Sequence, residues 1–434
     1  MRLAFLSPLP PLPTGIADYA ADVLGLLATR HDVEVFHDQE SVERSRLPEG
    51  CAVRHVSGFD ARRRAAGFDV VVYQLGNGPS HAFLYDHISR VPGLLTLHDL
   101  VLHHSRAASF LEAEPVRAWR DDPGSTSARE AARPWLDRWR AELEYAYPGA
   151  GSRLFEAQLG TVGDLLPYSY PLFRVPVEAS RLVAVHNAFM AEAVREEVPD
   201  AGVAILPQPA ASTPVDRALV ADLRRRLGFS DDAVVVGCFG LLTVEKRIET
   251  VARAVARAAA GDARIRLLLA GAVSDPGWLR RVLERVGVAG RTTVTGRVPF
   301  AELPAHIEAA DVVVHLRYPT GRETSGALLR VLAQGRPTVV SDLEHQADLP
   351  PDAVLRADLA AEERDVTRAI VRLAGDARGR EELGRRAAAF VREHHSAARV
   401  VEAWERALDE TRRRPDPPER RWPAHWPRPE RRAS

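Results

Sequence analysis

Two polar segments follow apolar runs that have the length of buried strands, and both could bind the phosphates of a ligand. In the first segment Lys246 follows the run 234–239, and it is the single lysine among 58 basic residues. Where arginine fills nearly every basic position, a retained lysine indicates a place that needs a compact ammonium group. A phosphate would supply the anion that a cation in a first helical turn needs. A surface lysine paired with Glu245 is the alternative.

The second segment, residues 318–330, follows the run 312–316 and precedes a predicted helix. Thr324 and Ser325 are good N-caps, and the free N–H groups of a helix start beside Gly326 could bind phosphate. Glu323 would then stand at the mouth of this site. The alternative is a surface glutamate before an ordinary capped helix.

Polar residues also follow predicted strands in the first half of the chain. His98 and Asp99 could bind sugar hydroxyls or transfer protons, although a purely structural histidine is equally consistent with the sequence. Asn77 lies in a Gly-Asn-Gly turn that could become a ligand loop. The spacing of these residues fits neither a zinc motif, a dinucleotide fingerprint nor a Walker loop. No Asp-x-Asp occurs, which argues against a metal-bridged diphosphate.

Short apolar runs alternate with amphipathic segments, and this pattern predicts parallel strands joined by crossover helices. A helix should follow the proline-rich turn that ends at Thr14-Gly15, and surface helices forming a variable wall should occupy 105–175. Prolines 207, 209 and 214 break the chain between two such series. The predicted strands are 3–6, 33–36, 70–75, 94–97, 182–185 and 203–206, then 234–239, 266–270, 292–295, 312–316 and 338–340. The predicted domains are 1–208 and 209–396, followed by a helix at 397–411 and a disordered Pro/Arg-rich tail at 412–434.

Composition excludes several classes of protein. The 434 residues are 46% apolar and 27% charged, which predicts more than one core, and the formal net charge of −1 provides no basic field for nucleic acid. Cys51 and Cys238 are too few and too distant for a disulfide framework, so a reducing, cytoplasmic compartment is expected. No apolar stretch reaches the length of a membrane span.

Together these motifs resemble the retaining family 4 glycosyltransferases, from Ser7 to about Trp404. The resemblance rests on the glycine after the first proline loop, Gly-x-x-x-x-Glu-Lys opening the second half, and the glutamate before the capped helix that ends at Gly335-Arg336-Pro337. It implies an α/β protein of the GT-B fold, with two Rossmann-like domains facing each other across a cleft. The first domain would bind mainly the acceptor and the second mainly the nucleotide-sugar donor, and the last helix would pack back onto the first.

The resemblance also assigns roles to residues. Lys246 would neutralise the leaving phosphate, Glu323 and His98 would bind the donor sugar, and Asn77 and Asp99 are the candidate acceptor-binding residues. Backbone groups near the phosphates would come from Gly15, Gly240, Thr324, Ser325 and Gly326. The chain departs from the family at Leu241, where an arginine is usual, so Arg247, Arg317 or Arg322 would have to replace that cation. Arg330 stands where the family has a second, ribose-binding glutamate, with Glu323 shifted by one residue.

The expected function is a retaining hexosyltransferase that needs no metal or cofactor and uses a nucleotide sugar as co-substrate. Its acceptor would be a saccharide, a lipid-linked saccharide or another hydroxyl compound, as in polysaccharide biosynthesis. A catalytically weak binding or regulatory subunit and a GT-B sugar-nucleotide epimerase are the alternatives. Arg62-Arg63-Arg64 could hold the protein at the inner face of a membrane, although a solvated turn is the favoured account.

Overall fold

The computed structural model describes residues 1–160 and 165–430, and the chain divides into two compact units. The N-terminal unit comprises Met1–Pro207, Gly321–Thr324 and the chain from Val400 onward. The C-terminal unit comprises Gln208–Thr320 and Ser325–Arg399. The first boundary lies one residue before the predicted one, and the short segment Gly321–Thr324 belongs to the N-terminal unit, which the sequence did not predict.

The N-terminal unit is built on a seven-stranded parallel sheet in the order β3-β2-β1-β4-β5-β6-β7. Six strands occur where apolar runs predicted them, and only the short edge strand β3 was missed. Its sequence, Ala-Val-Arg-His, contains no apolar run because an edge strand is half exposed. The strands are β1 (Arg2–Leu6), β2 (Asp32–His37), β3 (Ala52–His55), β4 (Val70–Leu75), β5 (Leu94–Leu97), β6 (Leu182–Val185) and β7 (Val203–Ile205).

Helices cover both faces of this sheet, so alternate residues of one strand enter different cores. Leu3 and Phe5 of β1 pack on one side, in a cluster that includes Trp404 of α18, and Ala4 and Leu6 pack on the other. The helices are α1 (Gly15–Leu27), α2 (Phe59–Ala66), α3 (Leu84–Arg90), α4 (His103–Leu111), α5 (Glu114–Asp121), α6 (Thr126–Ala146), α7 (Gly151–Leu159), α8 (Leu166–Ser169), α9 (Arg174–Glu178), α10 (Ala188–Glu197) and α18 (Ala397–Arg413).

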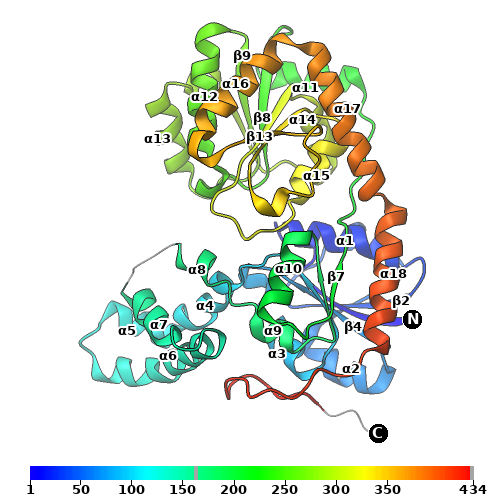
Figure 1. Cartoon of the computed structure of the whole chain (residues 1–434), viewed down its shortest axis with the longest axis vertical. Coiled ribbons are helices and arrows are strands. Elements are labelled where there is room, and N and C mark those ends of the chain that lie inside the picture. Colours follow the sequence, from blue (N-terminus) through cyan, green and yellow to red (C-terminus); the bar gives the residue numbers. More distant parts are fainter. Residues whose placement is uncertain (161–164, 431–434) are drawn as a thin grey trace. The chain divides into compact units, whose positions relative to one another are not determined.

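Helices α4–α8 form a helical group beside the sheet (Figure 1). Helices were predicted here, but they are more than a surface wall. Phe110, Trp139 and Leu143 belong to a separate hydrophobic cluster, and the Trp139 ring stacks on Phe110 with ring centroids 5.7 Å apart. Part of the predicted stretch 105–175, residues 161–164, lies outside the described residues.

The C-terminal unit has a six-stranded parallel sheet in the order β10-β9-β8-β11-β12-β13. The prediction missed only the three-residue edge strand β13, which is too short to show a pattern. Its strands are β8 (Val234–Phe239), β9 (Ile265–Ala270), β10 (Thr292–Gly296), β11 (Val312–His315), β12 (Thr338–Ser341) and β13 (Leu355–Ala357). Its helices are α11 (Arg217–Arg226), α12 (Ile248–Gly261), α13 (Pro276–Val286), α14 (Leu303–Glu308), α15 (Gly326–Ala333), α16 (Glu362–Gly375) and α17 (Ala377–His394).

The C-terminal tail differs from its prediction. Residues 414–430 contain no helix or strand, but Trp422 and Trp426 are each only 3% exposed and belong to a core cluster of the N-terminal unit. The indole N–H of Trp422 donates to Glu178 (3.0 Å), and that of Trp426 donates to Glu142 (2.9 Å). The expected disorder is therefore wrong for residues 412–430, because two tryptophans supply the apolar surface that the arginines and prolines lack. Residues 431–434 lie outside the described part of the chain.

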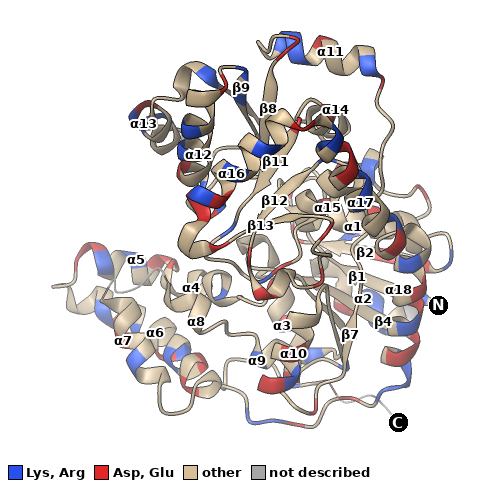
Figure 2. Cartoon of the chain, turned by 45° about the horizontal axis from the view of Figure 1, so that its top comes forward, with Lys and Arg blue, Asp and Glu red and all other residues tan. Residues whose placement is uncertain are grey.

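Charged residues show no segregation by sign within either unit. In the ribbon of Figure 2, the positions of basic and acidic residues are interspersed along the helices. Within the Arg62–Arg64 run, Arg62 donates to Glu34 (2.9 Å) and Arg63 pairs with Glu430, so two of these cations are neutralised in the folded chain. No helix in the described ranges combines the length and the apolar character that crossing a membrane requires.

Candidate active site

The C-terminal sheet has a topological switch point between β8 and β11, because the strands that follow each of them are added on opposite sides. In open parallel sheets, ligands bind outside the carboxyl ends of the strands at such a point. Here β8 ends at Phe239, with Gly240 next in the chain, and β11 ends at His315. Gly240 has φ +98°, a backbone conformation that strongly favours glycine.

Lys246 lies beside this switch point as a buried cation. It ends a 3-10 turn (Val244–Lys246), is only 8% exposed, and has its Nζ 3.8 Å from the place where a Cβ on Gly240 would be. Burial and then the charge of Arg317 hold the pKa of Lys246 well below its ordinary value. Across the described ranges, no carboxylate lies within ion-pair distance of its ammonium group. A buried cation in this position needs an anion, which a ligand can supply.

The position of Lys246 corrects one detail of the sequence interpretation. The residue precedes the helix rather than lying in its first turn, since α12 begins at Ile248 and Arg247 is its N-cap. Arg247 has φ +55°, so the chain turns sharply between the two cations. The helix dipole therefore acts on Lys246 less directly than predicted, and burial is the main reason for its need of an anion.

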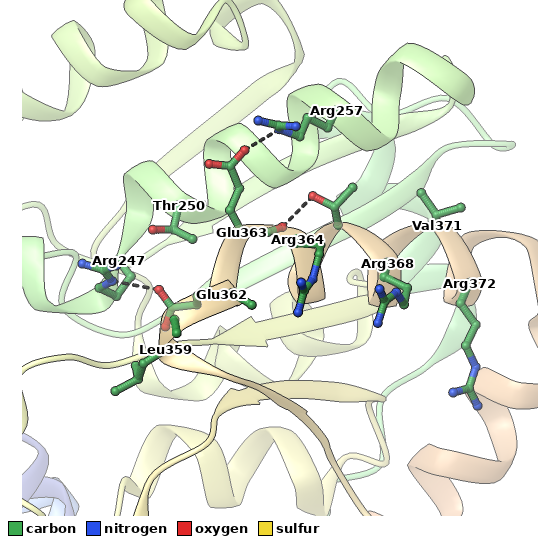
Figure 3. A pocket seen from close by; sticks show the side chains of 13 residues that line it. Arg247, Thr250, Arg257, Leu359, Glu362, Glu363, Arg364, Arg368, Val371 and Arg372 are labelled. Atoms are coloured by element: carbon green, nitrogen blue, oxygen red, sulfur yellow. Dashed lines mark hydrogen bonds and ion pairs between the residues drawn. The ribbon is translucent and has the colours of Figure 1, made fainter.

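Among the three arginines proposed to replace the missing cation, Arg247 is already committed. Its Nε donates to the buried carboxylate of Glu362 (2.8 Å), which also accepts from Ser341 Oγ (3.1 Å). Figure 3 shows this pair at one end of a hollow of about 800 Å³ between α12 and α16, where Arg257 also pairs with Glu363. Lys246 does not line this hollow.

Arg317 fits the role better. It follows β11 at the switch point, its backbone N–H donates to Ser341 Oγ (3.0 Å), and its charge lowers the pKa of both Lys246 and His315. These three groups therefore form a cluster of basic side chains at the carboxyl end of the sheet.

The predicted phosphate-binding helix is α15. Ser325 is its N-cap and accepts from the backbone N–H of Leu328 (3.3 Å), and Gly326 is its first residue. The first N–H groups of such a helix favour an anion. Arg330, five residues into the helix, places its guanidinium over the ring of Phe300, with the central carbon 4.5 Å from the ring centroid. This contact gives no support to its expected role in binding the nucleotide.

Three residues expected to bind the donor lie in the N-terminal unit instead. In the segment Gly321–Thr324, the side-chain N–H of Asn187 donates to Arg322 O (3.0 Å) and Thr324 Oγ1 (3.1 Å). Gly321 O accepts from the backbone N–H of Leu100 (2.9 Å). Arg322 donates to Tyr168 O (3.4 Å), so Arg322, Glu323 and Thr324 are held with the first sheet.

Two carboxylates converge at this segment. Glu323 Oε2 and Asp99 Oδ1 lie 3.2 and 3.3 Å from the place where a Cβ on Gly321 would be, so a larger residue at 321 would crowd both. The backbone N–H of Asn77 donates to the other Asp99 oxygen (2.9 Å), and the Asn77 amide lies 3.0 Å from His104 Nδ1. Asn77, Asp99 and Glu323 thus form one polar group at the carboxyl ends of β4 and β5, suited to sugar hydroxyls.

His98 is placed differently from its expected role. Its ring is buried, with Nε2 2.8 Å from Gln74 Oε1 and Nδ1 2.9 Å from His186 Nε2. His186 Nδ1 in turn donates to Leu206 O (2.8 Å). Burial, and then the neighbouring His186, hold the pKa of His98 well below its usual range. Since both ring nitrogens are engaged inside the unit, the structure gives no support to a contact between this ring and a donor sugar.

Gly15 begins α1 at the carboxyl end of the first sheet. Thr14 caps the helix by accepting from Ala17 N (3.0 Å). Nothing lies within 4 Å of the place where a Cβ on Gly15 would be. The packing of the unit therefore does not require glycine here.

Sequence reasoning missed three residues that contact the candidate residues: His186 beside His98, Asn187 beside Arg322 and Thr324, and His315 near Lys246. Each is a polar residue at the end of an apolar strand, the same signal that identified His98 and Asp99. No cluster of three or more His, Cys, Asp or Glu side chains able to hold a metal ion occurs within residues 1–160 and 165–430.

The C-terminal unit is similar to a known protein family. Residues 233–376, which include Lys246, His315 and Arg317, match the family model described as glycosyl transferases group 1. The C-terminal unit therefore carries a group 1 glycosyltransferase domain, and the sheets of both units define the GT-B fold.

Individual proteins that the chain resembles either match only part of it or have low sequence identity. The D-inositol 3-phosphate glycosyltransferase of Stackebrandtia nassauensis is 34% identical over 143 residues, a match that covers 31% of each protein, so the chain spans about a third of that relative. Sucrose-phosphate synthase from Thermosynechococcus elongatus has a similar fold (TM-score 0.64, 17% identity, 94% of this chain and 98% of that one). Anabaena HepE, solved with UDP, is also similar (TM-score 0.61, 14% identity, 94% and 100%).

Proposed function

We propose that this chain is a retaining glycosyltransferase that moves a sugar from a nucleotide-sugar donor to a hydroxyl acceptor without a metal ion. The observation that carries the proposal is the buried ammonium of Lys246, which has no carboxylate partner at the switch point and lies beside Arg317. Both cations and the start of α15 would hold the donor diphosphate. The match to group 1 glycosyltransferases supports this, as do the structures of HepE with UDP and with UDP-glucose.

In this proposal the bond from the anomeric carbon to the leaving phosphate oxygen breaks, and the acceptor oxygen bonds to the same face of that carbon. The leaving phosphate takes the acceptor proton, so no protein base is needed. Lys246 and Arg317 stabilise the charge that develops on the diphosphate, and preorganised charge of this kind is usually the largest catalytic contribution.

Glu323, Asp99 and Asn77 would orient sugar hydroxyls. Their carboxylates and amide accept hydrogen bonds, and their place in the N-terminal unit agrees with an acceptor-binding function for that unit. The acceptor would be a saccharide or a lipid-linked saccharide.

The proposal is tested by thermal-shift screening of the full chain against nucleoside diphosphates and their sugars, because a ligand that binds the native state raises its melting temperature. The donor that stabilises the protein is then incubated with saccharide acceptors, and NMR of the product gives its anomeric configuration. Inversion would refute the retaining mechanism. Failure of every nucleotide to bind would refute the donor site.

A further inference from the structure

His315, the last residue of β11, is a buried imidazole with no hydrogen bond. Its side chain is 2% exposed, its Nε2 is fully buried, and neither ring nitrogen has a hydrogen-bond partner in the part of the chain that the structure describes. Buried polar groups are nearly always hydrogen-bonded, so an exception calls for a missing partner. His315 pairs with Val340 of β12 in the register of the sheet, which places it at the carboxyl end of β11, beside the switch point.

The groups that surround His315 offer no acceptor for its ring N–H. Burial, and then the charges of Lys246 and Arg317, hold the pKa of His315 well below its usual range, so its ring is neutral. Both neighbouring cations are donors without acceptor atoms. Cys238, which faces Lys246 from β8, is a protonated thiol because burial raises its pKa to about 12. No acidic side chain contributes to the field at His315, so the ring has an unused N–H in a region of positive charge.

We propose that His315 is a third diphosphate-binding residue, which donates an N–H hydrogen bond to a phosphate oxygen of the donor beside Lys246. The inference rests on the proposed function, since it assumes a nucleoside diphosphate at the switch point. It adds to that function a residue whose own charge can change, whereas the charge of an arginine or of a helix start cannot.

The bound diphosphate should also change the protonation of this ring. Its negative charges reverse the field of Lys246 and Arg317, which raises the pKa of His315 in the complex. His315 then takes a proton from solvent, and no bond of the nucleotide breaks. Because the bound form has the higher pKa, affinity gains from this proton at low pH and loses it as the pH rises through the pKa of the complex. The pKa of Lys246 is also lowered by burial, so any fraction of this side chain that is neutral before binding takes up a proton in the same way.

Calorimetric titration of the full chain with UDP and with inorganic pyrophosphate separates proton uptake by His315 from proton uptake by Lys246. Repeating each titration in buffers of different ionisation enthalpy gives the number of protons taken up. Lys246→Arg keeps a permanent cation, so the uptake that this variant loses relative to the parent belongs to Lys246. His315→Gln keeps an N–H donor but cannot titrate, so the uptake that it loses relative to the parent belongs to His315. His315→Leu removes the donor as well.

We expect His315→Gln to bind within about threefold of the parent while its proton uptake falls, and His315→Leu to bind about tenfold or more weakly, the scale of a hydrogen bond to a charged group. His306→Gln is the matched control, because His306 is buried in the same unit but already bonded to Glu302 O (2.9 Å). Neither affinity nor uptake should change in that variant.

Two failures are distinguishable. If neither UDP, another nucleoside diphosphate nor pyrophosphate binds the parent chain, the proposed function is wrong. If the parent binds but His315→Gln takes up as many protons as the parent, and Lys246→Arg takes up none, the inference about His315 is overturned alone. Melting temperatures of all variants accompany the titrations, and if His315→Leu does not fold, the comparison of His315→Gln with the parent decides.

Discussion

At the residue scale, the basic side chains expected to bind phosphate and the carboxylates expected to bind hydroxyl groups lie in different units. Lys246, Arg317 and His315 gather at the end of the C-terminal sheet, where no acidic side chain pairs with Lys246 among the described residues. Asp99 and Glu323 gather in the N-terminal unit. Cations suit the phosphates of a donor, and carboxylates suit hydroxyl groups, so substitutions in the two groups should affect different steps.

Lys246→Ala should lower turnover by at least ~10²-fold, the scale of removing one preorganised electrostatic contact. Lys246→Arg should recover only part of the loss, because the planar guanidinium is longer than the ammonium it replaces in a buried position. Steady-state rates with a saturating donor measure both. Arg257→Ala, which removes an exposed arginine of the α12–α16 hollow, is the control. Rates equal to the parent in both Lys246 variants would show that the lysine does not contact the donor.

Glu323→Gln should reduce turnover far more than affinity for the nucleoside diphosphate. The reason is that Glu323 is held with the N-terminal unit, beside Asp99, whereas the diphosphate should bind the C-terminal cations. Turnover and calorimetric titration with the diphosphate are measured on the same preparation. A variant that loses diphosphate affinity and turnover equally would place Glu323 on the phosphates instead.

At the element scale, the C-terminal tail is an ordered strap on the N-terminal unit. Arg106 of α4 donates to Glu142 of α6 (2.9 Å), and its guanidinium lies over the rings of Tyr85 and Trp426. Trp426 and His425 of the tail also contact Glu142 (2.9 and 2.7 Å). The tail thereby covers a buried ion pair between α4 and α6. Helix α4 also carries His104, whose ring lies beside Asn77.

Trp426→Ala should destabilise the N-terminal unit by about 3–5 kcal/mol, as expected for deleting a buried aromatic side chain. Two effects contribute to this loss of stability. The substitution leaves a cavity, and it removes the indole contacts with the buried Arg106–Glu142 ion pair. Urea unfolding followed by circular dichroism measures it. Arg421→Ala, an exposed change in the same strap, should have almost no effect. Equal midpoints for the two variants would show that the strap does not stabilise the unit.

Glu142 also predicts an acid-dependent loss of stability. Burial raises its pKa, but the charge of Arg106 and the hydrogen bonds from His425 and Arg106 outweigh this and hold the pKa below the ordinary 4.5. Because the pKa of Glu142 is lower in the folded state than in the unfolded state, its ionised carboxylate stabilises the fold in full above pH 4.5. This contribution to the free energy of unfolding is lost as the pH falls through the lowered pKa.

Glu142→Gln should therefore cost about 3–5 kcal/mol near pH 7, because Arg106 is left buried without a counter-charge. The difference in the free energy of unfolding between this variant and the parent should become smaller below pH 4.5. Unfolding midpoints at several pH values test this, and a difference that stays constant down to pH 3 would contradict the assignment of the pair.

At the scale of the whole molecule, the chain passes between the two units after Pro207, Thr320, Thr324 and Arg399. Each unit therefore contains segments that are far apart in the sequence. Residues 321–324 illustrate the consequence: they interrupt the C-terminal unit in sequence, yet they carry Glu323 to the N-terminal sheet.

Donor binding and turnover should survive chelation of divalent metals, because in the proposed mechanism Lys246, Arg317 and the start of α15 would balance the charge of the diphosphate. Dialysis against EDTA, followed by calorimetry with the nucleoside diphosphate and by rate measurement, tests this. Full loss of turnover that returns with manganese or magnesium would overturn the mechanism. The proposal for metal-free transfer stands on these cations and is independent of the His315 inference.

The sequence by itself determined the two parallel sheets, most strands to within a residue, and which polar residues lie at the strand ends. These features are local: a buried strand requires a continuous apolar run, and a polar residue directly after it lies at the sheet edge where ligands bind. Lys246 was found in this way, as were Asp99, Asn77 and the start of α15. Only short edge strands escaped, because a half-exposed strand of three or four residues has no distinctive pattern.

Tertiary structure alone decided which of the candidates remain available to a ligand. Arg247 is bound to Glu362, 115 residues away, and the His98 ring to His186, 88 residues away, so neither commitment has a local signature. The same holds for residues 321–324, whose partners in the N-terminal unit lie more than a hundred residues earlier, and for the tail, whose tryptophans find Glu142 and Glu178. Hydrogen bonds and apolar burial between distant segments depend on how the chain returns on itself, and the local pattern of residue types does not contain that information.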